Sequence, residues 1–498
     1  MKDKKGQIGS SHRPPIVAVL GHVDHGKTTL LDYIRHTNVA SREHGGITQH
    51  IGAYQINIKN QISNIKNNDN AIITFIDTPG HEAFMKMRSR GARVADIAVL
   101  VVAADDSVKP QTKESIRIIK DASIPVIVAV NKIDLPSANA EIVKQDLARS
   151  DVQVEGFGGD VPVVLLSAKT GKGVDELLEK ITALSHTLNL VNQPNLPLEA
   201  VVIETRLDKG KGMVASCIVK AGTLRGGMSL FEDSLQVAKV RALFDEQGVG
   251  VKDALPGKPV EILGFTTLPH IGSLLHGEPQ QEGTEQSIQP EEKKQQGEMD
   301  FLSFAPREKT LHIILKADTA GSLEAICASL KKGATLVEKG IGEINEADVL
   351  LAKSTGSFII GFNIKRKRDV EKFAETEGIV LRNYTVIYEL LDEVNDAISG
   401  MQEVLTKERE LGKGAIIAEF PYDGKRVAGV KVTEGRLARG DQVKIMRHGE
   451  EAGRAKIKSI RKGKEETTKA ESGIECGILF DGKVDFELQD AIIAFIRS

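Results

Sequence analysis

Apolar runs of strand length recur through the first part of the chain and alternate with segments whose apolar residues follow helical spacing. The runs cover residues 15–20, 72–76, 97–102, 126–130 and 163–166. Strands that are apolar along their whole length, and that alternate with helices, are typical of a parallel sheet covered by helices on both faces. We therefore predict an α/β domain over residues 13–190, after a polar tail over residues 1–12.

The pattern changes further along the chain. Short alternating runs with Gly-rich turns predict a β-barrel over residues 196–270, and a stretch rich in Glu, Gln and Lys predicts a linker or insertion over residues 271–306. Strand and helix patterns then alternate again over residues 307–383. Apolar residues at helical spacing predict a connecting helix over residues 384–412, and short strands predict a second β-barrel over residues 413–498.

Composition narrows the possible functions. With 498 residues the chain is too long for one hydrophobic core, and its net charge of −3 means that any nucleic-acid contact has to come from a local basic surface. The cysteines Cys217, Cys327 and Cys476 form no CxxC pair, so we expect neither a zinc site nor disulfides. The N-terminus has no apolar signal-peptide core, and no run approaches the length of a membrane span, which predicts a cytoplasmic protein without membrane contact.

Residues 21–28 (GHVDHGKT) match the P-loop pattern GxxxxGK[ST], after a predicted strand and at the start of a predicted helix. Glycines let backbone N–H groups approach phosphates, and a helix N-terminus favours negative charge. Lys27 is placed to reach the β- and γ-phosphates, and Thr28 to bind Mg²⁺. A chance glycine turn would match the same letters, so the argument depends on the strand and helix around them. The predicted nucleotide contacts here are Gly21, His22, Val23, Asp24, His25, Gly26, Lys27, Thr28 and Thr29.

Two further segments are predicted to face the phosphates. Residues 77–81 (DTPGH) follow a predicted strand, which makes Asp77 a second Mg²⁺ partner and lets the backbone N–H of Gly80 meet the γ-phosphate. Thr48 lies between the two motifs and is predicted to sense the γ-phosphate and Mg²⁺. Each segment has a plain alternative, a surface turn for the first and a flexible-loop threonine for the second.

Two later segments, NKID and SAK, are predicted to read the base, because each follows its own strand. They supply Asn131, Lys132, Asp134, Ser167, Ala168 and Lys169 as predicted contacts. The Asp134 carboxylate can accept hydrogen bonds from the ring N1–H and the exocyclic amine of guanine, a donor pair that adenine lacks. A backbone N–H of the SAK segment would then lie near the guanine O6. Four motifs in this order predict a domain that binds and hydrolyses GTP.

From residue 13 to its C-terminus the chain resembles the translational GTPases, and specifically bacterial translation initiation factor two. The matching segments are residues 21–28, 45–52 (GGITQHIG), 77–81, 316–325 (KADTAGSLEA), 344–351 (INEADVLL), 359–363 (IIGFN) and 475–477 (ECG). The resemblance implies a P-loop GTPase domain, a β-barrel, an α/β/α sandwich domain, a long connecting helix and a second β-barrel. It also implies GTP and GDP as ligands, together with Mg²⁺.

The resemblance further implies ribosome-stimulated hydrolysis in which His81 orients the attacking water, while Val23 and Ile47 hold this histidine back until the ribosome moves it. The implied role is to place formylmethionyl initiator tRNA on the small ribosomal subunit and promote joining of the large subunit, as a monomer acting beside other initiation factors. Ten Lys or Arg against three Asp or Glu between residues 436 and 464 would provide a local basic surface. The implied tRNA contacts are Arg461, Lys462, Lys464, Glu475, Cys476 and Gly477.

The sequence departs from the family pattern in three places. The long N-terminal region is almost absent, residues 266–306 differ from the usual connection, and Gly463 stands where an aromatic residue is common. One other function stays open, a nucleotide-gated binding module with negligible hydrolysis, such as a ribosome-assembly or anti-association factor. The domains after residue 306 disfavour an elongation-type factor, and the NKID segment disfavours an ATP-dependent kinase.

Overall fold

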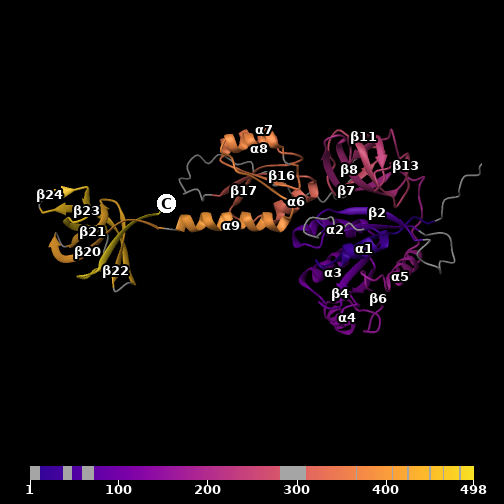
Figure 1. The fold of residues 1–498 in the computed structure, drawn as a ribbon, viewed down its shortest axis with the longest axis horizontal. Coiled ribbons are helices and arrows are strands. Elements are labelled where there is room, and N and C mark those ends of the chain that lie inside the picture. The colour runs from indigo at the N-terminus through magenta and orange to yellow at the C-terminus, as the bar shows by residue number, and fades with distance from the viewer. Residues whose placement is uncertain are drawn as a thin grey trace, which may run out of the picture. The chain divides into compact units, whose positions relative to one another are not determined.

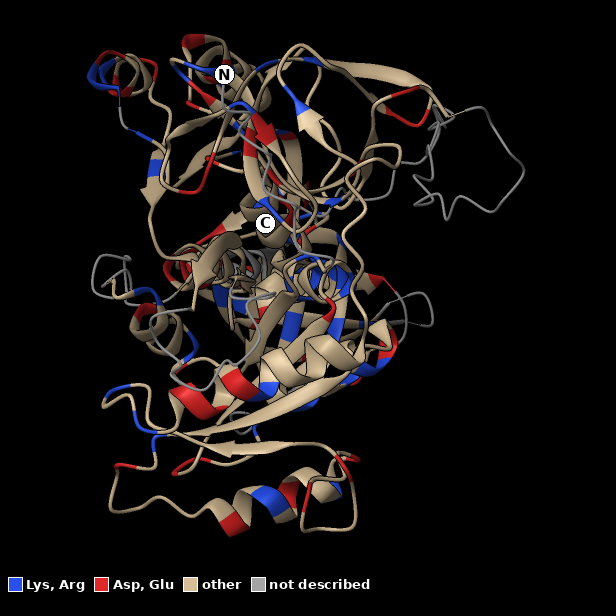
Figure 2. Ribbon diagram, turned by 90° about the vertical axis from the view of Figure 1, so that its right-hand side faces the viewer, with Lys and Arg blue, Asp and Glu red and all other residues tan. Residues whose placement is uncertain are grey.

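The computed structural model describes residues 12–37, 48–58, 72–280, 310–365, 367–406, 408–422, 425–447, 450–463, 465–481 and 484–497. The chain divides into two units, Met1–Glu393 and Val394–Ser498. Figure 2 shows Lys and Arg interspersed with Asp and Glu over the ribbon, as expected for a net charge of −3. Over the described residues, no helix is both long enough and apolar enough to cross a membrane.

A six-stranded sheet with the order β2-β3-β1-β4-β5-β6 forms the first part of the first unit. Its strands are β1 (Ile16–Gly21), β2 (Gly52–Asn57), β3 (Ile72–Asp77), β4 (Ile97–Ala103), β5 (Val126–Asn131) and β6 (Val163–Leu165). All neighbours are parallel except β2, which pairs antiparallel with β3. The expectation of a wholly parallel sheet was therefore wrong at this edge. We missed β2 because only alternate residues of this edge strand are buried, so it has no continuous apolar run.

Helices cover both faces of this sheet (Figure 1). They are α1 (Lys27–Arg35), η2 (Glu82–Phe84), α2 (Met85–Val94), α3 (Pro110–Ala122), α4 (Ala140–Arg149) and α5 (Val174–Thr187). Val17 and Val19 of β1 share a buried cluster with apolar residues of α1 and α5. Ala18 and Leu20 point to the other face and share a cluster with residues of α2, α3 and α4. Because β1, β3, β5 and β6 run parallel, their carboxyl ends meet at one edge of the sheet.

A β-barrel follows, with a seven-stranded sheet in the order β10-β15-β7-β8-β14-β11-β12 and a small β13-β9 pair. Its strands are β7 (Glu199–Asp208), β8 (Gly212–Ala221), β9 (Leu224–Arg225), β10 (Ser229–Glu232), β11 (Leu235–Phe244), β12 (Gly250–Val251), β13 (Asp253–Ala254), β14 (Pro259–Phe265) and β15 (Leu274–His276). The predicted linker therefore begins too early at residue 271. Residues 274–276 form β15, which pairs with β7 and buries Leu275 completely. A strand of three residues is too short to give a recognisable pattern in the sequence.

A four-stranded parallel sheet with the order β17-β16-β18-β19 completes the first unit. Its elements are β16 (Leu311–Ala317), α6 (Ala320–Ser329), β17 (Ala334–Ile341), α7 (Glu346–Thr355), β18 (Phe358–Phe362), α8 (Arg368–Thr376) and β19 (Leu381–Tyr384). A capping box begins α7: the Asn345 side chain accepts from the Asp348 N–H at 3.1 Å, and Asp348 accepts from the Asn345 N–H at 2.9 Å.

The helix α9 (Ile387–Thr406) spans the boundary between the units and precedes a second barrel. The barrel strands are β20 (Glu408–Tyr422), β21 (Lys425–Ala438), β22 (Gln442–Arg447), β23 (Glu450–Lys462), β24 (Glu465–Thr467), β25 (Lys469–Glu471), β26 (Glu475–Asp481) and β27 (Ala491–Arg497). The predicted connecting helix was too long at residue 412, because β20 already begins at Glu408 and Leu411 packs on the barrel core. The predicted fold class is confirmed.

Candidate functional site

The loops at the carboxyl edge of the first sheet enclose a cavity of about 370 Å³. Its walls come from the segments after β1, β3, β5 and β6, with Thr48 from the segment before β2. The lining residues are Val23, Asp24, Gly26, Lys27, Thr28, Thr29, Thr48, Gly80, His81, Asn131, Lys132, Asp134, Leu135, Ala168 and Lys169. Five other predicted contacts belong to the same segments but do not line the cavity: Gly21, His22, His25, Asp77 and Ser167. Ile47 lies outside the described residues.

Two glycines let the loop between β1 and α1 pack tightly. Gly21 has φ +147°, and a Cβ there would lie 2.3 Å from the carbonyl oxygen of Val101. Gly26 has φ +88°, and its Cβ would lie 2.3 Å from the side-chain nitrogen of Asn131. Any larger residue would push the loop away from its neighbours, which explains why the P-loop pattern has glycine at these two positions.

Lys27, the first residue of α1, turns back into its own loop. It is 6% exposed, and its Nζ donates to the carbonyl oxygens of Gly21 at 3.0 Å and His22 at 2.6 Å. Burial lowers the pKa of Lys27 to about 8, although the nearby Asp77 carboxylate opposes this shift. The ammonium group is thus held inside the loop, where an anionic phosphate would stabilise its charge.

The loop histidines pack against each other behind the cavity. Their ring centroids are 4.9 Å apart, His22 contacts the Gln111 side chain, and His25 Nε2 lies 3.4 Å from Asp106. Burial, followed by the neighbouring His22, lowers the pKa of His25 to about 4. Within the described residues, these two histidines and Asp106 are the one cluster with metal-ligand spacing, and their atoms lie within 4.8 Å of one another.

Two oxygen donors line the cavity, and the carboxylate of Asp77 follows on the neighbouring strand β3. The hydroxyl groups of Thr28 and Thr48 are 2.7 Å apart, and Asp77 is the last residue of β3. Hydroxyl and carboxylate oxygens are the ligands that Mg²⁺ prefers, and the two hydroxyls are close enough to bind one ion. The donor set therefore fits Mg²⁺, which would bind to Thr28 and Thr48 and be neutralised by Asp77.

Asn131 connects the two ends of the cavity. Its Nδ2 donates to the carbonyl oxygen of His25 at 2.9 Å, and its Oδ1 accepts from the backbone N–H of Ala168 at 2.9 Å. Asp134 is exposed at the mouth, where a hydrogen bond from Ser167 lowers the pKa of its carboxyl, with a smaller contribution from the positive charge of Lys169. The carboxylate is therefore ionised and able to accept hydrogen bonds from a base.

His81 lines the cavity and caps the N-terminus of η2. Its Nδ1 accepts from the N–H of Ala83 at 2.9 Å, which leaves the proton of the neutral ring on Nε2. Burial, followed by the charge of Arg88, lowers the pKa of His81. Arg88 is fully buried and donates to the carbonyl oxygens of Pro79 and His81. We did not anticipate Arg88, because in sequence it is one basic residue on an amphipathic helix.

Five of the six residues implied for tRNA binding lie on β23 and β26, two neighbouring strands of the second barrel. Arg461 of β23 pairs with Gly477 of β26, and Glu475 is exposed with its carboxylate 3.6 Å from Lys431 Nζ. Lys462 is exposed, and Lys464 lies outside the described residues. Cys476 points into the barrel core, and burial raises the pKa of its thiol to about 11. The structure thus brings Arg461, Lys462 and Gly477 together, whereas the Cys476 side chain faces the interior.

Three family models match successive parts of the chain. They are the elongation factor Tu GTP binding domain over residues 12–187, elongation factor G domain 2 over residues 197–277, and translation-initiation factor 2 over residues 285–395. A P-loop cavity with the NKID segment, followed by this barrel, defines the class of translational GTPases.

Relatives identify the family within that class. The chain is 43% identical to translation initiation factor IF-2 of Methylocella silvestris over 96% of this chain and 55% of that protein. It is 43% identical to the same factor of Persephonella marina (97% and 56%) and 42% identical to that of Halothermothrix orenii (99% and 73%). The chain belongs to the translation initiation factor IF-2 family. It spans little more than half the length of the first two relatives.

Proposed function

We propose that the protein binds GTP and hydrolyses it to GDP and phosphate when stimulated by the ribosome. The observation that carries this proposal is the convergence of four motifs, far apart in sequence, on one cavity with a buried ammonium at one end and an ionised carboxylate at the other. The cavity thus offers a cation to the phosphates and a hydrogen-bond acceptor to guanine.

The proposed reaction relies mainly on positioning and charge. Lys27 and the backbone N–H groups of its loop stabilise the charge on the transferring phosphoryl group, and Mg²⁺ would supply further positive charge there. His81 orients the attacking water, and in the ligand-free structure the N–H of Ala83 holds its ring in place through Nδ1. The lowered pKa of His81 keeps the ring neutral near pH 7. We assign His81 to positioning the water rather than removing its proton.

We further propose that the protein is an initiation factor that binds formylmethionyl initiator tRNA, places it on the small ribosomal subunit and promotes joining of the large subunit. Family membership supports this role, as does the group of Arg461, Lys462 and Gly477 on adjacent strands. Basic side chains suit the tRNA backbone. A formyl group removes the amino charge of methionine, so a mostly apolar surface would discriminate against the charged form.

GTP turnover by the full chain, measured with and without ribosomes, tests the enzymatic proposal. We expect ribosomes to raise turnover strongly. Binding of GTP with no turnover under either condition would instead favour a nucleotide-gated binding module. For the tRNA, protection of the formylmethionyl ester from hydrolysis should be greater than protection of the unformylated ester; equal protection would contradict the assignment.

A further inference from the structure

The first turn of α9 contacts the segment that carries Thr48. Gln49 is 7% exposed, and its side chain makes two hydrogen bonds to the start of this helix. Its Nε2 donates to the carbonyl oxygen of Thr385 at 2.8 Å, and its Oε1 accepts from the N–H of Ile387 at 3.0 Å. The second bond satisfies a backbone N–H that no residue of the helix itself can pair. Thr48 hydrogen-bonds to Thr28 of the P-loop motif. Its neighbour Gln49 therefore fixes the position at which α9 begins.

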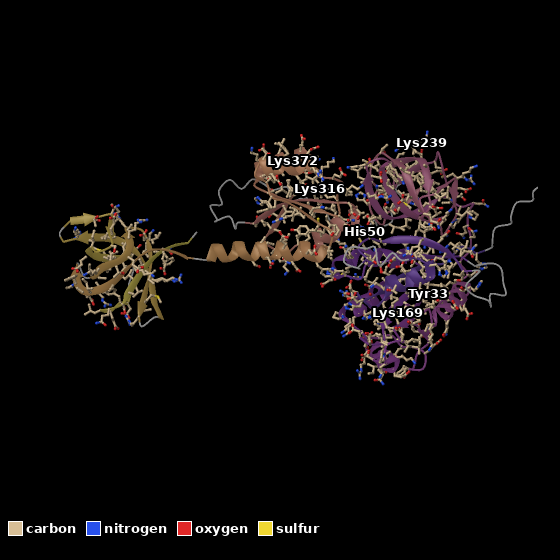
Figure 3. The ribbon with its side chains drawn as sticks, viewed as in Figure 1. Tyr33, His50, Lys169, Lys239, Lys316 and Lys372 are labelled. Atoms are coloured by element: carbon tan, nitrogen blue, oxygen red, sulfur yellow. The ribbon has the colours of Figure 1, made fainter. Side chains whose placement is uncertain are left out.

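The next residue ties the same segment to the neighbouring sheet. His50 Nε2 lies 3.1 Å from Asn363 Nδ2 and 3.3 Å from Asp318 Oδ2, and both partners follow strands of the β17-β16-β18-β19 sheet. Figure 3 labels His50 at this junction. Thr48, Gln49 and His50 thus contact the P-loop, the start of α9 and this sheet in turn, so the first turn of α9 has a defined position beside the nucleotide cavity.

Tyr388, the second residue of α9, uses that position to contact His81. The two ring centroids are 4.1 Å apart and the ring planes are 87° to each other, an edge-to-face packing. His81 is therefore held on two sides, by Tyr388 at its ring and by the Ala83 N–H at Nδ1. Burial, followed by the negative charge of Asp24, raises the pKa of Tyr388, so its ring is neutral at physiological pH. The contact is one between two uncharged rings.

We infer that Tyr388 is a positioning residue for GTP hydrolysis, which restrains His81 in its Ala83-bonded orientation until the start of α9 moves. The inference rests on the proposed role of His81. Two fixed contacts make this orientation the resting one, and His81 has to leave it to orient a water at the phosphate. Edge-to-face aromatic contacts contribute enough beyond burial that losing one should change the rate by about two- to tenfold.

The test compares ring removal with ring retention. Tyr388→Ala should raise the ribosome-free kcat for GTP hydrolysis about two- to tenfold, with KM for GTP unchanged, because the restraint is lost and no nucleotide contact is. Tyr388→Phe keeps the ring and should restore the low rate. Glu389→Ala, an exposed neighbour on the same turn, serves as the matched control. An unchanged or lowered ribosome-free kcat in Tyr388→Ala would overturn the inference.

A double-mutant cycle separates this inference from the proposed function. In a His81→Ala background, Tyr388→Ala should no longer raise kcat, since the residue it restrains is absent. An undiminished gain in that background would mean that Tyr388 acts elsewhere, and the inference would fail while His81 kept its role. If His81→Ala alone left ribosome-stimulated hydrolysis intact, the proposed function of His81 would fail instead.

Discussion

The nucleotide cavity and the basic strands of the second barrel present their functional side chains in different ways. In the cavity, Lys27, Asn131 and His81 each hydrogen-bond to backbone atoms, which fixes their direction before any ligand arrives. On the barrel, Arg461 and Lys462 stand exposed on a strand, and the backbone ladder sets their spacing. The first arrangement suits a small ligand recognised atom by atom. The second suits a long, flexible polyanion, whose binding tolerates small displacements.

The strongest test of the preorganised cavity is His81→Ala. We expect ribosome-stimulated hydrolysis to fall by about a hundred- to ten-thousandfold, the range for losing a well-placed catalytic group, while GTP affinity stays nearly the same. Single-turnover hydrolysis on ribosomes and equilibrium binding of GTP would measure the two effects. The proposed subunit joining should persist, because the variant still binds GTP. A wild-type hydrolysis rate in the variant would remove His81 from the mechanism.

Asp134→Asn tests the other end of the cavity. The amide cannot accept both guanine donors, so we expect GTP affinity to fall by about a thousandfold, and XTP to bind in its place because xanthine offers a carbonyl acceptor to the new donor. Competition binding with GTP and XTP measures the switch. The exposed Asp160→Asn is a control that removes the same charge elsewhere. Normal GTP affinity together with no XTP binding would show that Asp134 does not read the base.

The stability of the folded chain at low pH tests the burial of His25 in the P-loop. His25 is 1% exposed with its pKa lowered to about 4, so between pH 6.5 and 4 the unfolded chain takes up a proton that the folded chain does not. The folded state should therefore lose stability as the pH falls through this window, by at most about 3 kcal/mol. Urea unfolding should show this loss reduced in His25→Gln and unchanged in His270→Gln, whose side chain is 90% exposed. Equal losses in both variants would contradict the assignment.

The smallest effect is expected on the barrel. Replacing Arg461 and Lys462 together by Ala should weaken initiator tRNA binding by about tenfold and reduce its salt dependence, since two phosphate contacts are lost. Filter binding at several salt concentrations measures both quantities. Lys239→Ala, a basic residue exposed on the first barrel, is the control. A large loss of discrimination between formylated and unformylated tRNA, at unchanged salt dependence, would instead make these residues part of a specific pocket.

The motifs that meet at the cavity could be recognised from the sequence because each is local. A glycine turn, a lysine and a threonine within eight residues, placed after a strand, depend on little beyond their own backbone. The contacts of Gln49 and Arg88 were not predictable in this way. Gln49 and Ile387 are 338 positions apart, and no local pattern reports that they meet. Likewise, β2 and β15 escaped prediction because each owes its place to pairing with a neighbour rather than to an apolar run of its own.

The amide of Asn131 has a consequence for how the ligand's two halves are held. One side chain bonds to the backbone of His25 in the phosphate loop and to that of Ala168 in the base-reading loop. Because both loops bond to Asn131, ordering one loop reduces the conformational entropy of the other. A guanosine fragment in the cavity would therefore raise the affinity for a separate pyrophosphate fragment, and the reverse would hold by the same factor, so the two fragments would bind cooperatively without touching.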